Sequence, residues 1–251
     1  MSLIHELRSL YHLTLAPIRG DTHAERLESF YKGQAESYDQ FRRRLLRGRE
    51  ELYAALPIRS GDVVVEMGAG TGGNLEFLGE RVALPEKIYL VDLSESLLGV
   101  AAKRARERGW RHVETALADA TAFVPAAGPA DVVTFSYSLT MIPDWFAAID
   151  QAYAILKPGG TIGVVDFYVS RKHPEKGRVR HSWPTRVFWP TWFGFDNVCL
   201  SSDHVPYLHR KFEPVDFHEK RNWMPYLPGL RVPYYWFVGR KPGEDGASAS
   251  T

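Results

Sequence analysis

Residues 63–73 read Val63-Val64-Val65-Glu66-Met67-Gly68-Ala69-Gly70-Thr71-Gly72-Gly73. The apolar, β-branched start of this stretch is typical of a buried strand, and the glycines that follow are typical of a tight turn. Glycine has no Cβ and tolerates positive φ, so its backbone can approach a ligand closely. The N–H groups that open the following helix point at whatever occupies the turn. The stretch therefore predicts a ligand site at the end of a central strand.

Two cofactors fit this turn. Gly68, Gly70 and Gly73 satisfy the G-x-G-x-x-G spacing of dinucleotide-binding proteins, so an NAD enzyme and a methyltransferase that binds S-adenosylmethionine both remain open. Glu66 separates the two, because it lies where a pyrophosphate would sit in an NAD site and like charges there repel. Facing the ammonium of a bound amino acid, directly or through water, the same carboxylate is attractive. Glu66 therefore favours S-adenosylmethionine.

Two more acids follow later strand-like stretches. Asp92 ends the apolar run 87–91 and is placed to accept hydrogen bonds from both ribose hydroxyls, a role that NAD enzymes share. Asp119 comes after a stretch near 113–115 and suits an adenine amino group. The three acids are 26 and 27 residues apart, which fits a repeating strand–helix unit. Each acid alone is more simply a solvated strand end or a helix N-cap, but the set together favours S-adenosylmethionine.

Composition limits the class of protein. The chain has 251 residues, of which 45% are hydrophobic, a formal net charge of +1 and a single cysteine, Cys199. The length suits one large α/β domain with an appendage, and the charge predicts no general affinity for nucleic acid. One cysteine excludes an internal disulfide and a cysteine-built zinc site, and we expect no bound metal. No apolar run reaches the roughly 18 to 20 residues of a spanning helix, and no export signal is evident. We expect a cytoplasmic protein, peripheral at most on the inner face of the membrane.

Strands and helices alternate from residue 62 onward. We expect strands near 62–67, 87–92, 112–116, 131–136, 161–167, 210–218 and 233–240, and helices near 74–82, 95–108 and 144–156. Strands separated by helices imply a doubly wound, mostly parallel sheet of seven strands that is covered on both faces. The last strand is expected to enter antiparallel. The turn Lys157-Pro158-Gly159-Gly160 is expected to close one helix and start the fifth strand.

Three segments surround this core. Residues 1–50 have helix-like spacing and predict an N-terminal helical cap on a domain that spans 51–242. Residues 169–209 form an insertion between the fifth and sixth strands, where a substrate site would be built. Its part from Arg171 to Phe195 is rich in cations and aromatic rings, which suits a lid over a substrate or a patch at a membrane interface. A packed lid without a membrane role is the plainer interpretation, and we expect residues 243–251 to be a disordered tail.

These motifs resemble known enzymes. The Glu66–Gly73 turn, Asp92, Asp119 and the 157–160 turn resemble those of Rossmann-like class I S-adenosylmethionine-dependent methyltransferases, over roughly residues 60–168. A narrower resemblance, to the methyltransferase part of betaine lipid synthases, spans most of the chain. It rests on Phe30-Tyr31, Gln34-Ala35, Tyr38-Asp39, Gly48-Arg49-Glu50, Phe135–Pro143, Asp150–Ala152, Asp166–Ser170, Phe188-Trp189, Asp196-Asn197 and Pro225–Tyr235. The resemblance implies methylation of the amino group of diacylglycerylhomoserine, up to three times, to form betaine lipid. It also implies a membrane-borne substrate and a separate partner enzyme that makes that substrate.

The resemblance further implies roles for single residues. Tyr31 and Tyr38 would close over the cofactor from the N-terminal helices. Glu66, Gly68, Gly70 and Gly72 would hold the methionine end of the cofactor, and Asp92 would hold the ribose. Asp119 and Ala120 would hold the adenine, and Ser136 would lie beside the sulfonium. Ala69 and Leu93 are further implied cofactor contacts.

Methyl transfer to an amine depends on alignment of the reacting atoms and on a free lone pair. An alkyl amine is mostly protonated at neutral pH, so a base near the mouth of the site, or burial that disfavours the ammonium, would help. The candidate residues for this role are Tyr38, Tyr137, Asp166 and His204. The aromatic faces of Tyr31, Tyr38 and Tyr137 also suit a sulfonium or a methylammonium through cation–π attraction.

Three other functions remain open at this point. A methyltransferase of the same fold that acts on a small soluble amine, phenol or quinone precursor would keep every cofactor residue. An NAD-dependent oxidoreductase is opposed by Glu66 and Asp119. A non-catalytic lipid-binding protein on the same scaffold is opposed by the intact glycines and Asp92.

Overall fold

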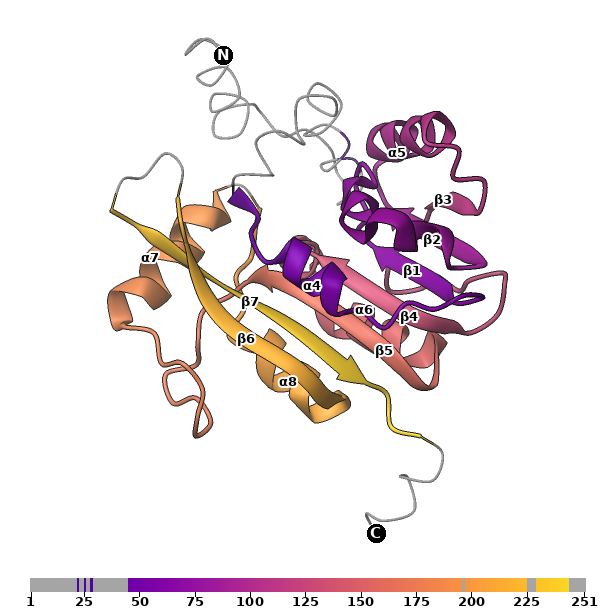
Figure 1. The fold of residues 1–251 in the computed structure, drawn as a ribbon. Helices are drawn as coiled ribbons and strands as arrows, with labels where there is room; N and C mark the ends of the chain where they lie inside the picture. Colours follow the sequence, from indigo (N-terminus) through magenta and orange to yellow (C-terminus); the bar gives the residue numbers. More distant parts are fainter. Residues whose placement is uncertain are drawn as a thin grey trace.

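A seven-stranded sheet with helices on both faces forms the centre of the molecule (Figure 1). The computed structural model describes Thr22, Glu25, Glu28 and residues 45–195, 197–224 and 229–243. The predicted fold class, a doubly wound and mostly parallel sheet, is confirmed. Most of the predicted N-terminal cap (1–50) and of the predicted C-terminal tail (243–251) lies outside the described residues.

The strand order in the sheet is β3-β2-β1-β4-β5-β7-β6. The strands are β1 (Val63–Met67), β2 (Lys87–Asp92), β3 (Val113–Leu117), β4 (Ala130–Ser136), β5 (Leu156–Phe167), β6 (Glu213–Trp223) and β7 (Arg231–Arg240). β1 to β5 pair in parallel, whereas β7 is antiparallel to both β5 and β6, as predicted for the last strand. The direction in which successive strands are added to the sheet reverses at β1, because β2 lies on one side of it and β4 on the other. In open α/β sheets ligands bind outside the carboxyl ends of the strands at such a point.

Helices cover both faces of the sheet. They are α4 (Arg49–Ala55), the 3₁₀ helix η1 (Gly73–Ala83), α5 (Glu95–Glu107), the short 3₁₀ helix η2 (Leu139–Met141), α6 (Trp145–Ile155), α7 (Trp183–Gly194) and α8 (His204–Lys211). One core contains Leu52 of α4, Leu75 of η1 and Phe193 of α7. The other contains Ile149 of α6 and Leu208 of α8. With both faces covered, all five residues of β1 are buried, which explains why its sequence is continuously apolar apart from Glu66.

Two local predictions differ in detail from the structure. The helix expected near 74–82 is a 3₁₀ helix that is interrupted at Gly79, whose φ of 57° and ψ of −130° no helix allows. Lys157–Gly160 belongs to β5 rather than to a turn before it, and the pairing of β5 with β4 jumps there from Ala130–Leu156 to Val132–Thr161. Two backbone hydrogen bonds with Lys241 stabilise this bulge. Gly159 N–H donates to Lys241 O over 3.0 Å, and Lys241 N–H donates to Gly160 O over 2.8 Å. That partner is distant in sequence, so a local turn pattern could not reveal it.

The predicted insertion at 169–209 contains α7 and the start of α8. Because α8 continues to Lys211, β6 begins later than the predicted sixth strand and extends to Trp223. No helix among the described residues is long and apolar enough to span a bilayer.

Candidate functional site

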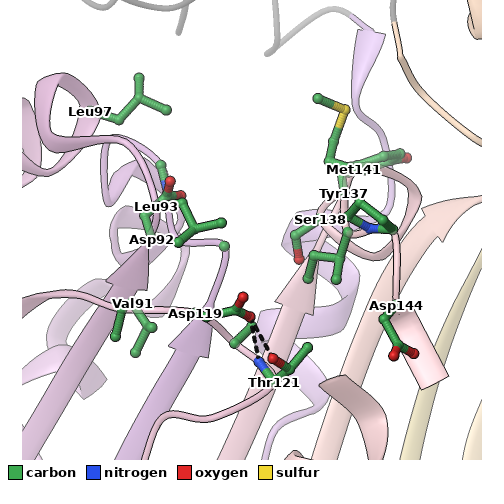
Figure 2. A pocket seen from close by; sticks show the side chains of 16 residues that line it. Val91, Asp92, Leu93, Leu97, Asp119, Thr121, Tyr137, Ser138, Met141 and Asp144 are labelled. Carbon is green, nitrogen blue, oxygen red and sulfur yellow. Dashed lines mark hydrogen bonds between the residues drawn. The ribbon is translucent and has the colours of Figure 1, made fainter. Parts of the chain in front are cut away.

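A cavity of about 260 Å³ opens at the carboxyl ends of β1, β2 and β4. Figure 2 shows its two sides facing each other, with Asp92, Leu93 and Asp119 on one side and Tyr137 and Met141 on the other. Its volume is near the lower end of the range for small-molecule sites, about 300–1,000 Å³. The cavity therefore lies where the strand order predicts a ligand.

The glycine turn after β1 forms the floor of the site. Gly68, Gly70 and Gly72 all have positive φ, of 69°, 56° and 66°, a conformation that other residues adopt only at a cost. A Cβ on Gly68 would lie 2.4 Å from the Cβ of Ser138, and one on Gly72 would lie 2.8 Å from Leu90 Cδ1. Gly68 and Gly70 also line the cavity, whereas Gly72 packs the turn against β2 and α5.

Asp92 joins the glycine turn to the start of α5. Gly70 N–H donates to its Oδ2 over 2.7 Å, and Ser94 N–H donates to its Oδ1 over 2.9 Å. The carboxylate also lines the cavity. An acceptor that is fixed in this way suits a ligand with neighbouring hydroxyl groups, such as the ribose of S-adenosylmethionine.

Asp119 combines a local role with a place in the cavity. Its Oδ1 accepts hydrogen bonds of 2.8 Å from both the N–H and the hydroxyl of Thr121 (Figure 2). Ala118, Ala120 and Leu97 also line the cavity. An apolar slot with one carboxylate at its edge has the character that an adenine ring requires.

Glu66 lies beneath the turn, and its side chain is almost completely buried. Asn74 Nδ2 donates to Glu66 Oε1 over 2.6 Å, and Arg49 Nη1 donates to Asn74 Oδ1 over 3.1 Å. Burial, and next the charge of Glu66, raises the pKa of Tyr53 well above its usual value. Glu66 is not among the described residues that line the cavity, so its predicted contact with a cofactor ammonium stays a prediction. The sequence analysis missed its partners Arg49 and Asn74.

Tyr137 lines the cavity but does not fit the predicted role of a base. Its hydroxyl donates to Arg47 O over 2.6 Å, and burial raises its pKa well above 10, so the phenol stays protonated at neutral pH. The residue has a φ of 55°, and its N–H donates to Val165 O over 2.7 Å. Its ring packs edge-on against Phe167 at 4.7 Å. Tyr137 is therefore a rigid part of the cavity wall.

Asp166 and His204 lie in the core rather than at the mouth of the cavity. Both are fully buried. The ring of His204 packs edge-on against Trp145 at 4.6 Å, and neither ring nitrogen has a hydrogen-bond partner among the described residues. Burial lowers its pKa to about 3, so it stays neutral. Neither residue is among those that line the cavity.

Asp166 instead supports the wall of the cavity from below. Its Oδ2 accepts from Thr140 N–H over 3.1 Å, and its Oδ1 accepts from the Thr140 hydroxyl and Phe167 N–H, both over 2.8 Å. Thr140 belongs to η2, next to Met141, which lines the cavity. Asp166 thus fixes the position of this wall.

Asp166 should make the stability of the protein depend on pH. Burial raises its pKa from 3.8 to about 7, so between these values the folded state holds a proton that the unfolded chain has lost. Its contribution to the free energy of unfolding should therefore fall as pH rises from about 4 to about 7, by at most about 4 kcal/mol, and stay constant above. Urea unfolding measures this effect: the free energy of unfolding of the wild type minus that of Asp166→Asn should decrease as pH rises from about 4 to about 7. Parallel pH profiles would contradict it.

The other predicted site residues either lie away from the cavity or fall outside the described residues. Ala69, Gly72 and Ser136 do not line the cavity, and the Ser136 hydroxyl is buried without a hydrogen-bond partner among the described residues. Tyr31 and Tyr38 lie outside the described residues.

Two acids near the cavity escaped the sequence analysis. Asp144 caps α6 by accepting from Ala147 N–H over 3.0 Å, and it lines the cavity on the Tyr137 side. In the sequence, an acid before an apolar helix indicates a helix cap. That pattern does not show that the same side chain lines a cavity. Glu28 accepts from the Ser94 hydroxyl over 2.7 Å and from Ser96 N–H over 3.2 Å, close to Asp92. No pattern in the sequence indicates that distant contact.

Comparison with known proteins agrees with this site. A family described as "Methyltransferase domain" matches residues 38–213. The demethylmenaquinone methyltransferase of Lactococcus lactis is 26% identical over 147 residues, which cover 57% of this chain and 58% of that protein. The ubiquinone/menaquinone biosynthesis C-methyltransferase UbiE of Hydrogenovibrio crunogenus is 31% identical over 111 residues, or 44% of each chain. The chain thus spans about half the length of these relatives.

Solved structures show the same fold. A phosphoethanolamine N-methyltransferase 2 of Haemonchus contortus, solved with S-adenosylhomocysteine, superposes with a TM-score of 0.65 at 15% identity, over 89% of this chain and 61% of that one. A SAM-dependent methyltransferase of Aquifex aeolicus gives a TM-score of 0.54 at 15% identity, over 82% and 97% of the two chains. Family and cavity agree on S-adenosylmethionine as the cofactor, as predicted, and set aside the NAD-dependent oxidoreductase. The chain belongs to the methyltransferase domain family.

Proposed function

We propose that this chain is an S-adenosylmethionine-dependent N-methyltransferase that acts on the amine of diacylglycerylhomoserine, up to three times, to form betaine lipid. One observation carries the proposal: the wall of the cavity opposite Asp92 is apolar from Met141 to Pro143 and ends in one exposed carboxylate, Asp144. An apolar wall next to a carboxylate suits an ammonium group that is attached to a lipid, because the wall can contact the hydrocarbon and the carboxylate can bind the charge. The resemblance of the sequence to betaine lipid synthases supports the same substrate, which a separate enzyme would supply.

The residues of the chain contribute mainly by position. S-adenosylmethionine, when bound, supplies a methyl group on a sulfonium centre. Asp92 and the glycine turn hold the cofactor end, while Tyr137, fixed by Arg47 and Val165, forms the opposite wall. Asp144 attracts the ammonium by charge and accepts its hydrogen bonds. The nitrogen must lose one proton before its lone pair can take a methyl group, and the exposed Asp144 carboxylate passes that proton to water. Holding the nitrogen and the methyl group in line accounts for a large part of the rate acceleration in such a displacement.

A second function has its own support. The relatives named above are quinone methyltransferases by name, and a C-methyltransferase acting on a quinone precursor would use the same cofactor residues. Its acceptor is uncharged, so Asp144 would have no ammonium to bind. The two functions therefore differ in how they depend on this carboxylate.

Mass spectrometry separates the two functions. The protein is incubated with S-adenosylmethionine and either diacylglycerylhomoserine or a demethylated quinone in mixed micelles. We expect the aminolipid to gain one, two and three methyl groups and the quinone to gain none. Methylation of the quinone alone would replace the proposal by the second function.

The variant Asp144→Asn tests the ammonium contact. Asparagine caps helices as well as aspartate does, so α6 should keep its stability. Without the charge, we expect the KM for the aminolipid to rise roughly 10-fold, as for the loss of one charge-assisted hydrogen bond. Cofactor affinity, measured by calorimetry, should not change. An unchanged KM would show that the ammonium is bound elsewhere.

A further inference from the structure

Helix α7 carries large aromatic side chains on two sides. Trp189 and Phe193 are buried, and Phe193 stacks on Phe167 at 4.9 Å. Trp183 and Phe195, by contrast, are 69% and 79% exposed. Phe188 and Trp192 stack on each other at 5.9 Å and are each 38% exposed. The inner side therefore attaches the helix to the core, and the other rings face outward.

The free ends of β6 and β7 extend this surface. Trp223 is 53% exposed, and the guanidinium of Arg231 lies over its ring at 4.0 Å. Trp189 and Phe193 of α7 pack in one core with Val232 of β7 and with Met224, which directly follows β6. Figure 1 shows α7 near this end of β6.

We call these outward rings and their cations the aromatic-basic surface. Its rings are Trp183, Phe188, Trp192, Phe195 and Trp223. Its cations are Arg186, Arg221 and Arg231, together with Lys172, Lys176 and Arg180, which precede α7 in the chain. Residues 171–195 contain six Lys or Arg and one acid, Glu175, although the whole chain has a net charge of only +1. Clustered exposed rings mark an interaction site, and the surrounding cations require an anionic partner.

This surface is connected to the wall of the cavity. Cys199 N–H, five residues after α7, donates to Thr140 O over 2.8 Å. Thr140 lies in η2 beside Met141, which lines the cavity. Both α7 and the cavity follow the carboxyl ends of parallel strands, so a partner on this surface would meet the edge of the molecule at which the cavity opens.

We infer that the aromatic-basic surface docks the protein on a bilayer that contains anionic phospholipids, and, resting on the proposed function, that the lipid acceptor is taken from this bilayer. Tryptophan and phenylalanine rings settle at the depth of the headgroups, and arginine and lysine pair with anionic lipids there. The surface offers both chemistries: Arg231 lies over the Trp223 ring, and the basic residues of 171–186 precede or lie in the helix that carries the other rings. Trp189, which lies within the predicted patch from Arg171 to Phe195, is buried in the core and does not belong to this surface.

Co-sedimentation with vesicles tests the inference, using the full chain and phosphatidylcholine with or without phosphatidylglycerol. We expect binding that phosphatidylglycerol strengthens and that salt weakens. The triple variant Trp183→Ser, Phe188→Ser, Trp192→Ser should lose about 10-fold or more of its affinity for both vesicles. The variant Lys172→Gln, Lys176→Gln, Arg180→Gln should lose only the gain from phosphatidylglycerol.

The matched control is Leu117→Ser with Val124→Ser, which removes two side chains that are 61% and 68% exposed near β3. It should bind vesicles like the wild type. No binding of the wild type to either vesicle, or equal binding by the aromatic variant, would overturn the docking surface.

Methylation in mixed micelles separates this inference from the proposed function. Aminolipid methylation without any vesicle binding would leave the function standing and reject the surface. Vesicle binding that the aromatic variant loses, without methylation of the aminolipid, would keep the surface and reject the function.

Discussion

Gly68→Ala should lower the free energy of unfolding by about 2–4 kcal/mol and weaken S-adenosylmethionine binding roughly 100-fold. The residue has a φ of 69°, and a Cβ there would lie 2.4 Å from Ser138 Cβ. Two parts of the cavity must separate to relieve that contact, because Gly68 and Ser138 both line it. Urea unfolding and calorimetric titration with S-adenosylmethionine measure the two effects.

Gly109→Ala is the matched control for backbone strain. Gly109 has a φ of 70°, but nothing lies within 4 Å of the position of its Cβ, so only the strain of about 1–2 kcal/mol should appear. Adding Ser138→Gly to Gly68→Ala should recover the steric part of the loss, which a double-mutant cycle would register as coupling. Equal losses for Gly68→Ala and Gly109→Ala, with no coupling to Ser138, would show that the contact is harmless.

Asp92→Ala should weaken cofactor binding by about 1.5–3 kcal/mol, or roughly 10- to 100-fold. The change removes the acceptor for the N–H groups of Gly70 and Ser94 and the carboxylate that we expect to bind the ribose. Calorimetric titration with S-adenosylmethionine or S-adenosylhomocysteine measures the loss.

Asp131→Ala is the control for Asp92→Ala. Asp131 accepts from Val63 N–H over 2.8 Å at the opposite end of β1 and pairs with Lys157, so its loss should lower stability without changing cofactor affinity. Equal affinity in both variants would move the cofactor away from Asp92.

The sequence predicts well what depends on neighbours along the chain. β1 and its glycine turn were predictable because a buried strand and positive φ each demand particular residues over a short stretch. The position of Asp92 was predictable because it is the last residue of an apolar strand. Its bonds to Gly70 and Ser94 lie at the carboxyl ends of β1 and β2, which the strand–helix repeat places next to each other.

Side-chain surroundings built by distant segments were not predictable. Glu66 meets Asn74 and, through it, Arg49 of α4, while Asp166 meets Thr140 at a separation of 26 residues. His204 is enclosed by Trp145 and Tyr235. An acid at a strand end or a histidine near an insertion looks the same in sequence whether it faces a cavity or the core.

The position of β7 has a consequence for synthesis of the protein. Among the described strands β6 pairs with β7 alone, and β7 also closes the open side of β5. Strands β1 to β5 can assemble as they leave the ribosome, but β6 emerges without a neighbour and waits for the last strand. A chain that ends before Arg231 would therefore leave unpaired the edges of β5 and β6 that face β7, and such edges invite association between molecules. The final residues of the sheet thus decide whether a newly made chain stays monodisperse.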